Sequence, residues 1–551
     1  MSFQKFREEC EKTVKNAVGE SVLEIPPKEI GADLAFPCFS LAKKMQKNPV
    51  EIAKEIVKPI TGEIMFSELI KRVEASGPYI NFYADWNKLG RFVIKQILND
   101  KERYCKGDKK GKVMIEFCHA NTHKAFHVGH VRNICIGESL SRIMEHNGYT
   151  VIRANYQGDI GMHVAKCLWG LQNLKLKKPK NMSNGVWLGI VYAKANKRIE
   201  GSKKLEEEVN KISSDLYKSS KKLMKLWKKT RQWSLDYFGN VYKDFGVKFD
   251  KLYFESKVFE RGMKIAKSLL RKKIAMMSEG AMIVDLRGYD LGVFIILKSN
   301  EDPLYSTKDL GLAELEFKEK PDRCVHVVGS EQKLYFQQLF KTFEMINKNW
   351  AEKSHHLAYE LVMLKSGKMS SREGSVVLYD DLRDDGTAKA EKEIRKRKVG
   401  KANVAKDIAL SAIKYSMLSR DNNKTILFDW SDVLNFEGDS GPYLQYTYAR
   451  ARSILRKSRK KYRVGAYDKE MAIVKKLSMF SDVIKKSAED MKPNYLANYL
   501  FELATAFNEF YQHRKVIGSD REEELLALVD AVSIILKNGL NLLGIRALEK
   551  M

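Results

Sequence analysis

Two histidines in a short turn are the residues of this 551-residue chain whose types and spacing most directly suggest chemistry. Residues 127–130 read His-Val-Gly-His and follow a strand-like stretch at 112–117 and a polar loop. A loop that leads from a parallel strand into a helix presents aligned N–H groups, which favour phosphate. Gly129 lets a nucleotide approach the backbone, while His127 and His130 can donate hydrogen bonds to phosphoryl oxygens. Isolated histidines are usually structural, so it is the strand–loop–helix context that makes the motif predict nucleotide binding without a protein-bound metal.

A second loop has the composition of a phosphate clamp. Residues 365–374 read Lys-Ser-Gly-Lys-Met-Ser-Ser-Arg-Glu-Gly and follow an extended apolar segment at 356–364. Taken alone, such a string is more often a surface loop. Paired with the histidine turn, it predicts that ATP is also bound by Lys368, Met369 and Ser370.

The elements around these loops predict a Rossmann-like core, because strand, loop, helix and strand in succession form the first crossover of a parallel sheet. A similar unit recurs later in the chain, and two such halves are typical of nucleotide-binding α/β folds. The predicted strands and helices of the two units lie at 112–117, 128–146, 149–155, 324–328, 332–346 and 356–364.

Residues 1–105 are predicted to form a small N-terminal α/β domain. An amphipathic helix at 3–18 opens it, a second helical pattern spans 49–60, and a short strand at 77–82 follows a turn signal. The charged stretch at 99–111 has the composition of a linker.

The catalytic domain is predicted to span 106–425 and to contain a lysine-rich helical insertion at about 174–242. The lysine blocks of that insertion could contact RNA, although such blocks are more often a solvated helix face. Residues 426–551 are predicted to form an all-helical bundle. One buried helix face is marked by the spacing of Leu496, Leu500, Leu503 and Phe507.

Composition narrows the class of protein. Lys plus Arg outnumber Asp plus Glu by 98 to 70, and the net charge of +28 would attract a polyanion, although a lysine-rich proteome would give the same excess. We expect a soluble, cytoplasmic chain without a membrane partner, because neither a long apolar run nor a secretion signal is apparent. The seven cysteines contain no Cys-x-x-Cys pair, so the sequence suggests neither a disulfide framework nor a structural metal.

The two motifs together resemble the signatures of class I aminoacyl-tRNA synthetases, His-Ile-Gly-His and Lys-Met-Ser-Lys-Ser. Further blocks narrow the resemblance to arginyl-tRNA synthetases, and together they cover nearly the whole chain. These blocks lie at 121–132, 305–310, 328–332 and 441–446, with Ala449-Arg450 following the last.

The resemblance implies ATP-dependent attachment of L-arginine to tRNA(Arg). Arginine would attack the α-phosphate of Mg²⁺-ATP to form arginyl-adenylate and pyrophosphate, and a terminal ribose hydroxyl of the tRNA would then take the arginyl group and release AMP. Members of this family frequently need bound tRNA before activation. The implied catalytic residues are His127, His130, Lys124 and Lys368.

A pocket for arginine must suit a planar cation with five donors, so it needs carboxylates and other acceptors. Tyr305 and Asp309 are four residues apart on a predicted helix and share one face, although such a pair is more often a surface detail. Glu116 ends a predicted core strand, where a buried carboxylate needs a partner that a substrate cation would supply. The arginine-binding residues that the resemblance implies are Glu116, Asn121, Glu255, Tyr305, Asp309 and Gln332.

The second signature departs from the family pattern, because position 371 is serine where a second lysine is usual. Charge that develops on the α-phosphate and pyrophosphate would be less compensated unless another cation reaches those oxygens. Lys124 lies three residues before His127 and is predicted to replace that lysine. Arg372, in the loop itself, is the competing candidate.

The outer domains resemble the two tRNA-binding domains of the same family. In the N-terminal domain, Tyr79 would stack on an unpaired base of the tRNA elbow and Asn81 would hydrogen-bond it. In the C-terminal, anticodon-binding domain, Tyr443 and Tyr446 are stacking candidates, although aromatic residues at helical spacing are as often core. We expect a monomer.

Two rival interpretations stay open at this point. One is another class I synthetase, such as the lysyl or cysteinyl enzyme, but the zinc-binding cysteines of the cysteinyl enzyme are absent. The other is an inactive paralogue that only binds RNA, which Ser371 would favour and the intact residues His127, Gly129, His130 and Lys368 argue against.

Overall fold

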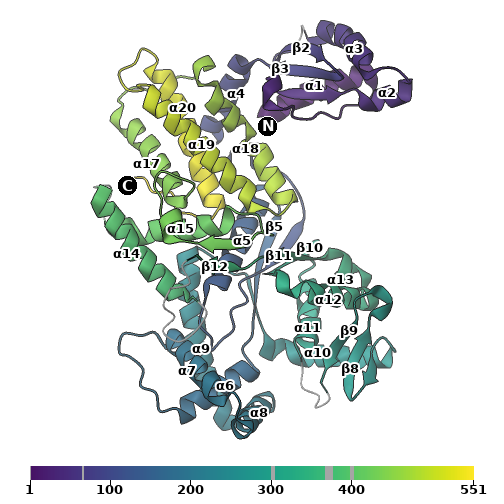
Figure 1. Cartoon of the computed structure of the whole chain (residues 1–551), viewed down its shortest axis with the longest axis vertical. Helices are drawn as coiled ribbons and strands as arrows, with labels where there is room; N and C mark the ends of the chain where they lie inside the picture. Colours follow the sequence, from purple (N-terminus) through teal and green to yellow (C-terminus); the bar gives the residue numbers. More distant parts are fainter. Residues whose placement is uncertain (1, 65–66, 299–303, 366–376, 398–401) are drawn as a thin grey trace.

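The computed structural model describes residues 2–64, 67–298, 304–365, 377–397 and 402–551. Figure 1 shows a small N-terminal α/β body, a central body around a parallel sheet, and a group of long helices from the C-terminal part of the chain. The central body carries two lobes that extend away from the C-terminal helices.

The N-terminal body is a three-stranded antiparallel sheet with helices packed on it. The strand order is β1-β3-β2, with Phe82 of β3 paired to both Leu34 of β1 and Val73 of β2. The predicted helices at 3–18 and 49–60 and the predicted strand at 77–82 are confirmed. The elements are α1 (Ser2–Val18), β1 (Leu34–Pro37), α2 (Phe39–Met45), α3 (Pro49–Ile64), β2 (Ile70–Ser76) and β3 (Tyr79–Ala84).

Helix α4 (Trp86–Asp100) joins this body to the C-terminal helices. It starts where the Asp85 carboxylate accepts hydrogen bonds from two backbone N–H groups of its first turn. Its apolar face packs against α18 (Met471–Glu489) and α20 (Glu522–Leu542). Gly90 lies so close to Val474 that an added Cβ would stand 2.9 Å from a methyl carbon. Residues distant in sequence therefore share one core here. The domain boundaries predicted at residues 105 and 425 stay predictions.

The central sheet confirms the Rossmann-like prediction. Its strand order is β11-β10-β4-β5-β6, and every pair is parallel. The strands are β4 (Lys112–Glu116), β5 (Thr150–Gln157), β6 (Lys251–Phe254), β10 (Arg323–Gly329) and β11 (Ser354–Tyr359). The chain leaves β4 toward β5 on one side, while β10 lies on the other, so the order reverses at β4. Parallel sheets bind ligands beyond the carboxyl ends of their strands at such a point.

Helix α5 (Val128–His146) has the bounds that the sequence predicts and packs against the sheet below the C-terminal helices. Its end is closed by the backbone N–H of Asn147, which donates to carbonyls of the last turn. The second crossover contains α12 (Lys333–Ile346) and α13 (Lys348–Lys353). A short parallel pair, β12 (Val362–Leu364) with β13 (Ile426–Phe428), follows β11.

Two insertions form the lobes that extend from the sheet. The first overlaps the region of the predicted helical insertion and consists of α6 (Met162–Asn173), α7 (Asn184–Ile199), α8 (Lys203–Tyr217) and α9 (Lys221–Phe245). The second lies between β6 and β10, and of its elements the sequence predicted only a helix that contains Tyr305 and Asp309. It consists of α10 (Glu255–Arg271), an antiparallel sheet in the order β7-β8-β9 (Met276–Ser278, Ala281–Asp285 and Val293–Leu297), and α11 (Tyr305–Lys318).

The C-terminal region is helical, as predicted, and the side chains of Leu496, Leu500, Leu503 and Phe507 are fully buried. Helix α20 is long and apolar enough to cross a membrane, but 78% of its most apolar stretch is buried within the protein. It is therefore a core helix. The remaining helices are α14 (Tyr379–Arg397), α15 (Ala405–Leu418), α16 (Trp430–Val433), α17 (Gly441–Lys457) and α19 (Pro493–His513).

Candidate active site

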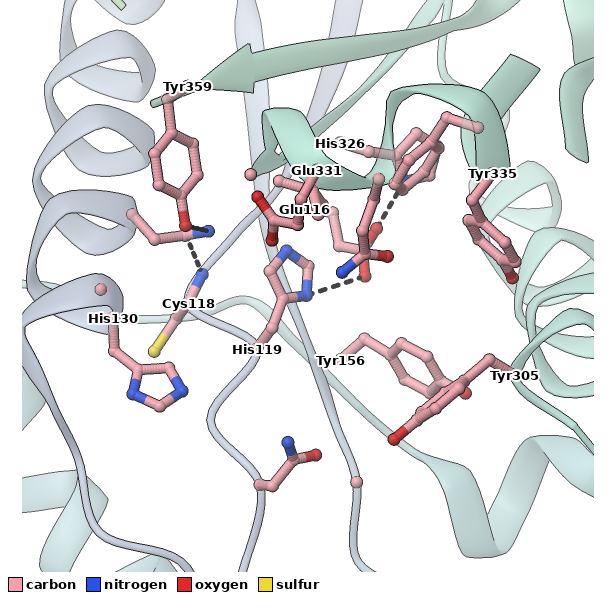
Figure 2. Close-up of a pocket in the computed structure, with 18 of the residues that line it drawn as sticks. Glu116, Cys118, His119, His130, Tyr156, Tyr305, His326, Glu331, Tyr335 and Tyr359 are labelled. Carbon is pink, nitrogen blue, oxygen red and sulfur yellow. Dashed lines mark hydrogen bonds and ion pairs between the residues drawn. The ribbon is translucent and has the colours of Figure 1, made fainter. Parts of the chain in front are cut away.

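A cavity of 1460 Å³ opens beyond the carboxyl ends of β4 and β10, where the strand order reverses. It brings together most of the residues that the sequence analysis selected, and Figure 2 shows the side chains around it. The predicted residues that line it are His127, Gly129, His130, Glu116, Asn121, Glu255, Tyr305, Asp309 and Gln332. Of the remaining ones, Lys124 is not part of the lining, and Lys368, Met369, Ser370, Ser371 and Arg372 lie outside the described residues.

The histidine turn is the N-terminus of α5, and both rings are held by backbone groups. The N–H of Gly129 donates to Nδ1 of His127 over 3.2 Å, and the N–H of His127 donates to Nδ1 of His130 over 3.2 Å. Burial and the nearby Lys124 lower the pKa of His127 to about 4. Burial, and to a smaller extent the neighbouring His127, lowers the pKa of His130 well below its usual value.

Both rings are therefore neutral at pH 7. A neutral imidazole whose Nδ1 accepts a hydrogen bond carries its proton on Nε2. Each Nε2–H can donate to a phosphoryl oxygen, which is the role that the sequence predicts. The glycine at position 129 also leaves room for the His127 ring, because an added Cβ would lie 3.1 Å from that ring.

Glu116 forms the floor of the cavity, and its partner is a protein residue. Its Oε2 accepts a hydrogen bond from Nδ1 of His326 over 2.5 Å, and its Oε1 lies 3.5 Å from Nδ1 of His119 (Figure 2). Burial alone would raise the pKa of Glu116, but His119 and His326 together lower it. The sequence predicted a substrate cation as the partner of Glu116 and pointed to neither histidine. His326 reaches Glu116 only through the pairing of β10 with β4, whereas His119 lies three residues farther along the same chain segment.

Tyr305 and Asp309 lie on one face of α11 and both line the cavity, which confirms the predicted helix and their shared face. The hydroxyl of Tyr335, from α12, donates a hydrogen bond to the Asp309 carboxylate. The pKa of Asp309 is raised to about 7, mainly by burial; the Tyr335 hydrogen bond opposes this rise, and the neighbouring carboxylates Glu116 and Glu255 add to it. Tyr305 is 62% exposed at the cavity mouth.

Glu255 is the first residue of α10 and is buried against a cation of α11. Its Oε2 lies 2.6 Å from Nζ of Lys308, also buried. Burial raises the pKa of Glu255, and Lys308 opposes that rise. Although Glu255 lines the cavity, its charge is thus paired within the protein, which sequence spacing could not reveal.

Lys124 lies beside the cavity on the side of the helical insertion. Its Nζ is 5.1 Å from the ring centroid of Tyr192 in α7. Burial and the neighbouring Lys166 lower the pKa of Lys124. Gln332 ends a turn at Ser330–Gln332 and is exposed at the cavity rim.

A fully buried arginine connects α5 to the segments around the second signature loop. The Arg132 guanidinium donates to the backbone carbonyls of Glu360 and Leu361, just before β12, and to those of Asp421 and Asn422 before β13. Five donors on a rigid fork suit this role. Arg132 lies within a block that resembles the family, but its contacts were not predicted.

One cluster at the cavity floor could hold a metal ion. Glu316, Cys324 and His326 are buried, and their ligand atoms lie within 4.8 Å of one another. This combination of ligands suits zinc. A sequence without Cys-x-x-Cys spacing can therefore still bring metal-ligating side chains together through its fold.

The predicted tRNA-contacting residues lie outside the cavity lining. Tyr79 packs edge-on against the half-exposed Phe39, with 5.6 Å between ring centroids. Asn81 is buried, and neither polar atom of its amide has a partner within the described residues. Tyr443 is buried against Phe501, so its side chain belongs to the core of the C-terminal helices. Tyr446 is half-buried, with the guanidinium of Arg450 4.7 Å from its ring centroid.

Comparison with known proteins identifies the family. Residues 93–430 match the family described as tRNA synthetases class I (R), catalytic domain. Residues 444–551 match the DALR anticodon binding domain, and residues 3–84 match the arginyl tRNA synthetase N terminal domain. The chain belongs to the arginyl-tRNA synthetase family. Among its relatives, the arginine–tRNA ligase of Clostridium perfringens is 34% identical and that of Bdellovibrio bacteriovorus 35% identical.

These alignments cover 97% of the chain and 96% of the Clostridium protein, and 96% and 93% for the Bdellovibrio protein. The arginyl-tRNA synthetase of Thermus thermophilus has a similar structure, with a TM-score of 0.83, 26% identity and complete coverage of both chains. The resemblance of the sequence to this family is thus confirmed. Within class I, membership favours arginyl over lysyl or cysteinyl synthetases.

Proposed function

We propose that this arginyl-tRNA synthetase family member attaches L-arginine to tRNA(Arg) with ATP, through arginyl-adenylate, and releases AMP and pyrophosphate. The observation that carries the proposal is one cavity with two chemically distinct sides. Neutral histidines at the N-terminus of α5 form one side, and the carboxyl groups of Glu116 and Asp309 form the other. The first side suits a triphosphate and the second a guanidinium.

In the proposed reaction the arginine carboxylate attacks the α-phosphate of ATP and pyrophosphate leaves. The Nε2–H groups of His127 and His130 would donate to phosphoryl oxygens as their charge increases. Glu116, Asp309 and Tyr305 would hold the cationic side chain, with Asn121 and Gln332 as further polar contacts. No covalent enzyme intermediate is needed, because positioning and charge stabilisation account for most of the catalysis. ATP would enter as its Mg²⁺ complex.

We propose that Lys124 replaces the lysine that is absent at position 371, where the chain has serine. Lys124 would act together with Lys368 of the second loop. Two observations support this proposal. Lys124 lies in the loop before His127, and its pKa is lowered because its ammonium group is buried close to Lys166. An anionic phosphate would supply the missing partner. In this proposal the ammonium turns from Tyr192 toward the cavity when ATP binds.

Alanine variants of the two cations test this assignment. Lys124→Ala is expected to lower the rate of arginine activation by about 100-fold, the usual effect of losing one transition-state donor. Lys166→Ala, which removes a neighbouring lysine that hydrogen-bonds Asn196, is the matched control and should retain near-normal activation. If Lys124→Ala left activation intact while Arg372→Ala abolished it, the assignment would be wrong.

The tRNA is proposed to contact both outer domains. Tyr79 and Asn81 would read a base of the elbow. Tyr446 is a better stacking candidate than the buried Tyr443 in the anticodon-binding domain. The net charge of +28 supports binding of a polyanion. We further propose that the chain acts as a cytoplasmic monomer.

Exchange of pyrophosphate into ATP tests the function as a whole. Each of the twenty amino acids is supplied in turn, with and without tRNA, and exchange is expected with arginine alone. Exchange with lysine or cysteine would indicate another synthetase. No exchange under either condition, with tRNA binding retained, would indicate an inactive RNA-binding paralogue.

A further inference from the structure

His326 occupies a fixed place beside Glu116 in the central sheet. The two residues are paired across β10 and β4, and both side chains are buried at the cavity floor. Nδ1 of His326 donates to Oε2 of Glu116 over 2.5 Å. The rings of Phe336 and Phe340 flank the imidazole at 5.6 and 5.8 Å between centroids, which fixes its plane.

A second buried carboxyl group lies close to the same imidazole. Glu316, from α11, is 1% exposed, and its Oε1 has no hydrogen-bond partner within the described part of the chain. Nε2 of His326 is likewise without a partner there. The polar atoms of Glu316 and His326 lie within 4.8 Å of each other, with Cys324 beside them. His326 therefore lies close to two buried carboxyl groups, those of Glu116 and Glu316.

The carboxyl groups of Glu116, Asp309 and Glu316 lie around the cavity floor. They cannot all ionise so close together without a cation. The one that His326 hydrogen-bonds is Glu116. Directions of the pKa shifts agree with this geometry: that of Glu116 is lowered, that of His326 is raised, and those of Asp309 and Glu316 are raised to about 7 and about 8. The shifts differ among the three groups: Glu116 is favoured as the ionised form, Asp309 is about half protonated at pH 7, and Glu316 is mostly protonated there.

We propose that His326 is a positioning residue that holds the Glu116 carboxylate oriented toward the cavity, so that Glu116 can bind the cationic part of arginine. The inference rests on the proposed function, because it takes arginine as the substrate. His119 supports Glu116 from the opposite side at 3.5 Å, and it is less buried than His326.

Two substitutions at position 326 separate positioning from a merely structural contribution. His326→Phe removes the donor and keeps an aromatic ring, and it is expected to raise the KM for arginine about tenfold or more while the KM for ATP stays within about twofold. His326→Asn places an amide N–H near the position of Nδ1 and should restore much of the arginine affinity. Both are measured by pyrophosphate exchange in the full-length protein, with the thermal unfolding midpoint as a check of folding.

His355→Asn is the matched control. His355 lies on the neighbouring strand β11, is half-buried and does not line the cavity. The KM of the His355→Asn variant for arginine is expected to equal that of the unmodified protein. Glu116→Gln is measured alongside and should raise the KM for arginine at least as much as His326→Phe does.

The outcomes distinguish the inference from the proposed function. If His326→Phe leaves the KM for arginine unchanged while Glu116→Gln raises it, the positioning role is wrong and the arginine pocket stands. If neither variant changes that KM, the assignment of Glu116 to arginine fails as well. One metal ion per chain that is lost in Cys324→Ser but kept in Cys167→Ser would also overturn the inference, because His326 would then be a neutral ligand.

Discussion

At the scale of single residues, the cavity shows how one kind of side chain acquires different charge states. Glu116 is paired with histidines and its pKa is lowered, whereas Asp309 accepts a hydrogen bond from a tyrosine hydroxyl and its pKa is raised. Glu255 pairs with Lys308, which opposes the effect of burial. Burial and the neighbouring charges, rather than the kind of carboxyl group, thus set the charge state of each acid before substrate arrives.

The pKa of Asp309 leads to a pH-dependent affinity for arginine. Only the ionised carboxylate attracts a guanidinium, and with a pKa of about 7 about a tenth of the empty sites carry that charge at pH 6 and about nine tenths at pH 8. The KM for arginine is therefore expected to fall about ninefold as pH rises from 6 to 8, and Asp309→Asn should flatten the profile. Initial rates of pyrophosphate exchange at varied arginine provide the measurement.

The KM for ATP is the internal control for this experiment. The pKa of His127 is about 4 and that of His130 is also far below its usual value, so both rings stay neutral throughout the range. A KM for ATP that changed in parallel with that for arginine would point to a general effect of pH on the fold. An arginine profile that persisted in Asp309→Asn would contradict the assignment.

The sequence predicted the residues of the site whose partners are local or belong to motifs. His127, Gly129 and His130 form one turn, and Tyr305 and Asp309 share one helix face, so spacing was sufficient. His326 is 210 residues away from Glu116 along the chain and meets it only through the register of β10 against β4. A lone histidine in an apolar strand gave no signal of that contact.

At the scale of elements, the crossing of α10 and α11 sets the arginine side of the cavity. Two glycines let the helix backbones touch: an added Cβ would lie 1.8 Å from the Thr307 carbonyl oxygen at Gly262, and 2.2 Å from the Val258 carbonyl oxygen at Gly311. This close approach brings Glu255, at the start of α10, to Lys308 of α11. The position of Asp309 depends on the same crossing.

Gly311→Ala is expected to separate the two helices and weaken arginine binding. A methyl group at 2.2 Å from a backbone oxygen cannot be accommodated by a side-chain movement, so the backbones must shift at a cost of about 1–3 kcal/mol. The KM for arginine should rise several-fold more than that for ATP, because α5 does not take part in the crossing. Steady-state kinetics and thermal unfolding of the full-length protein measure both effects.

Gly239→Ala is the matched control for that substitution. Gly239 lies inside α9, and nothing is found within 4 Å of an added Cβ. Alanine is the better helix former by about 0.5–1 kcal/mol, so this variant should be as stable as the unmodified protein or more stable. Equal arginine affinity in Gly311→Ala and Gly239→Ala would show that the helix crossing does not position the site.

Elements with strong local periodicity were predictable, and those defined by distant partners were not. Helix α5 has the bounds inferred from the sequence because a motif starts it and a turn ends it. The sheet β7-β8-β9 was missed because its strands contain only three to five residues, too few for a periodic signal. The core that α4 shares with α18 joins segments almost 400 residues apart, which no local pattern encodes.

At the scale of the whole molecule, α4 connects the N-terminal body to the C-terminal helices rather than to the catalytic sheet. The Asp33 carboxylate adds an ion pair to Lys475 of α18 at 2.8 Å. Figure 1 shows the N-terminal body at the end of the molecule opposite the two lobes of the central body. A tRNA that reaches the N-terminal body and the catalytic cavity must follow the length of the protein. A contact at β3 should therefore influence tRNA affinity and leave the activation of arginine at saturating tRNA unaffected.

Asn81 in β3 provides the test of that separation. Burying an amide without partners costs about 1–3 kcal/mol, so its retention is explained if a partner arrives with the tRNA. A base that stacked on Tyr79 in place of Phe39 would bring acceptors and donors to this amide. Asn81→Leu, of similar shape, is expected to keep or raise the thermal unfolding midpoint while raising the KM for tRNA about tenfold, as measured by aminoacylation. The KM for arginine at saturating tRNA should not change. An unchanged KM for tRNA would mean that the unpaired amide has no role in recognition, and a lowered midpoint would mean that it is satisfied within the free protein.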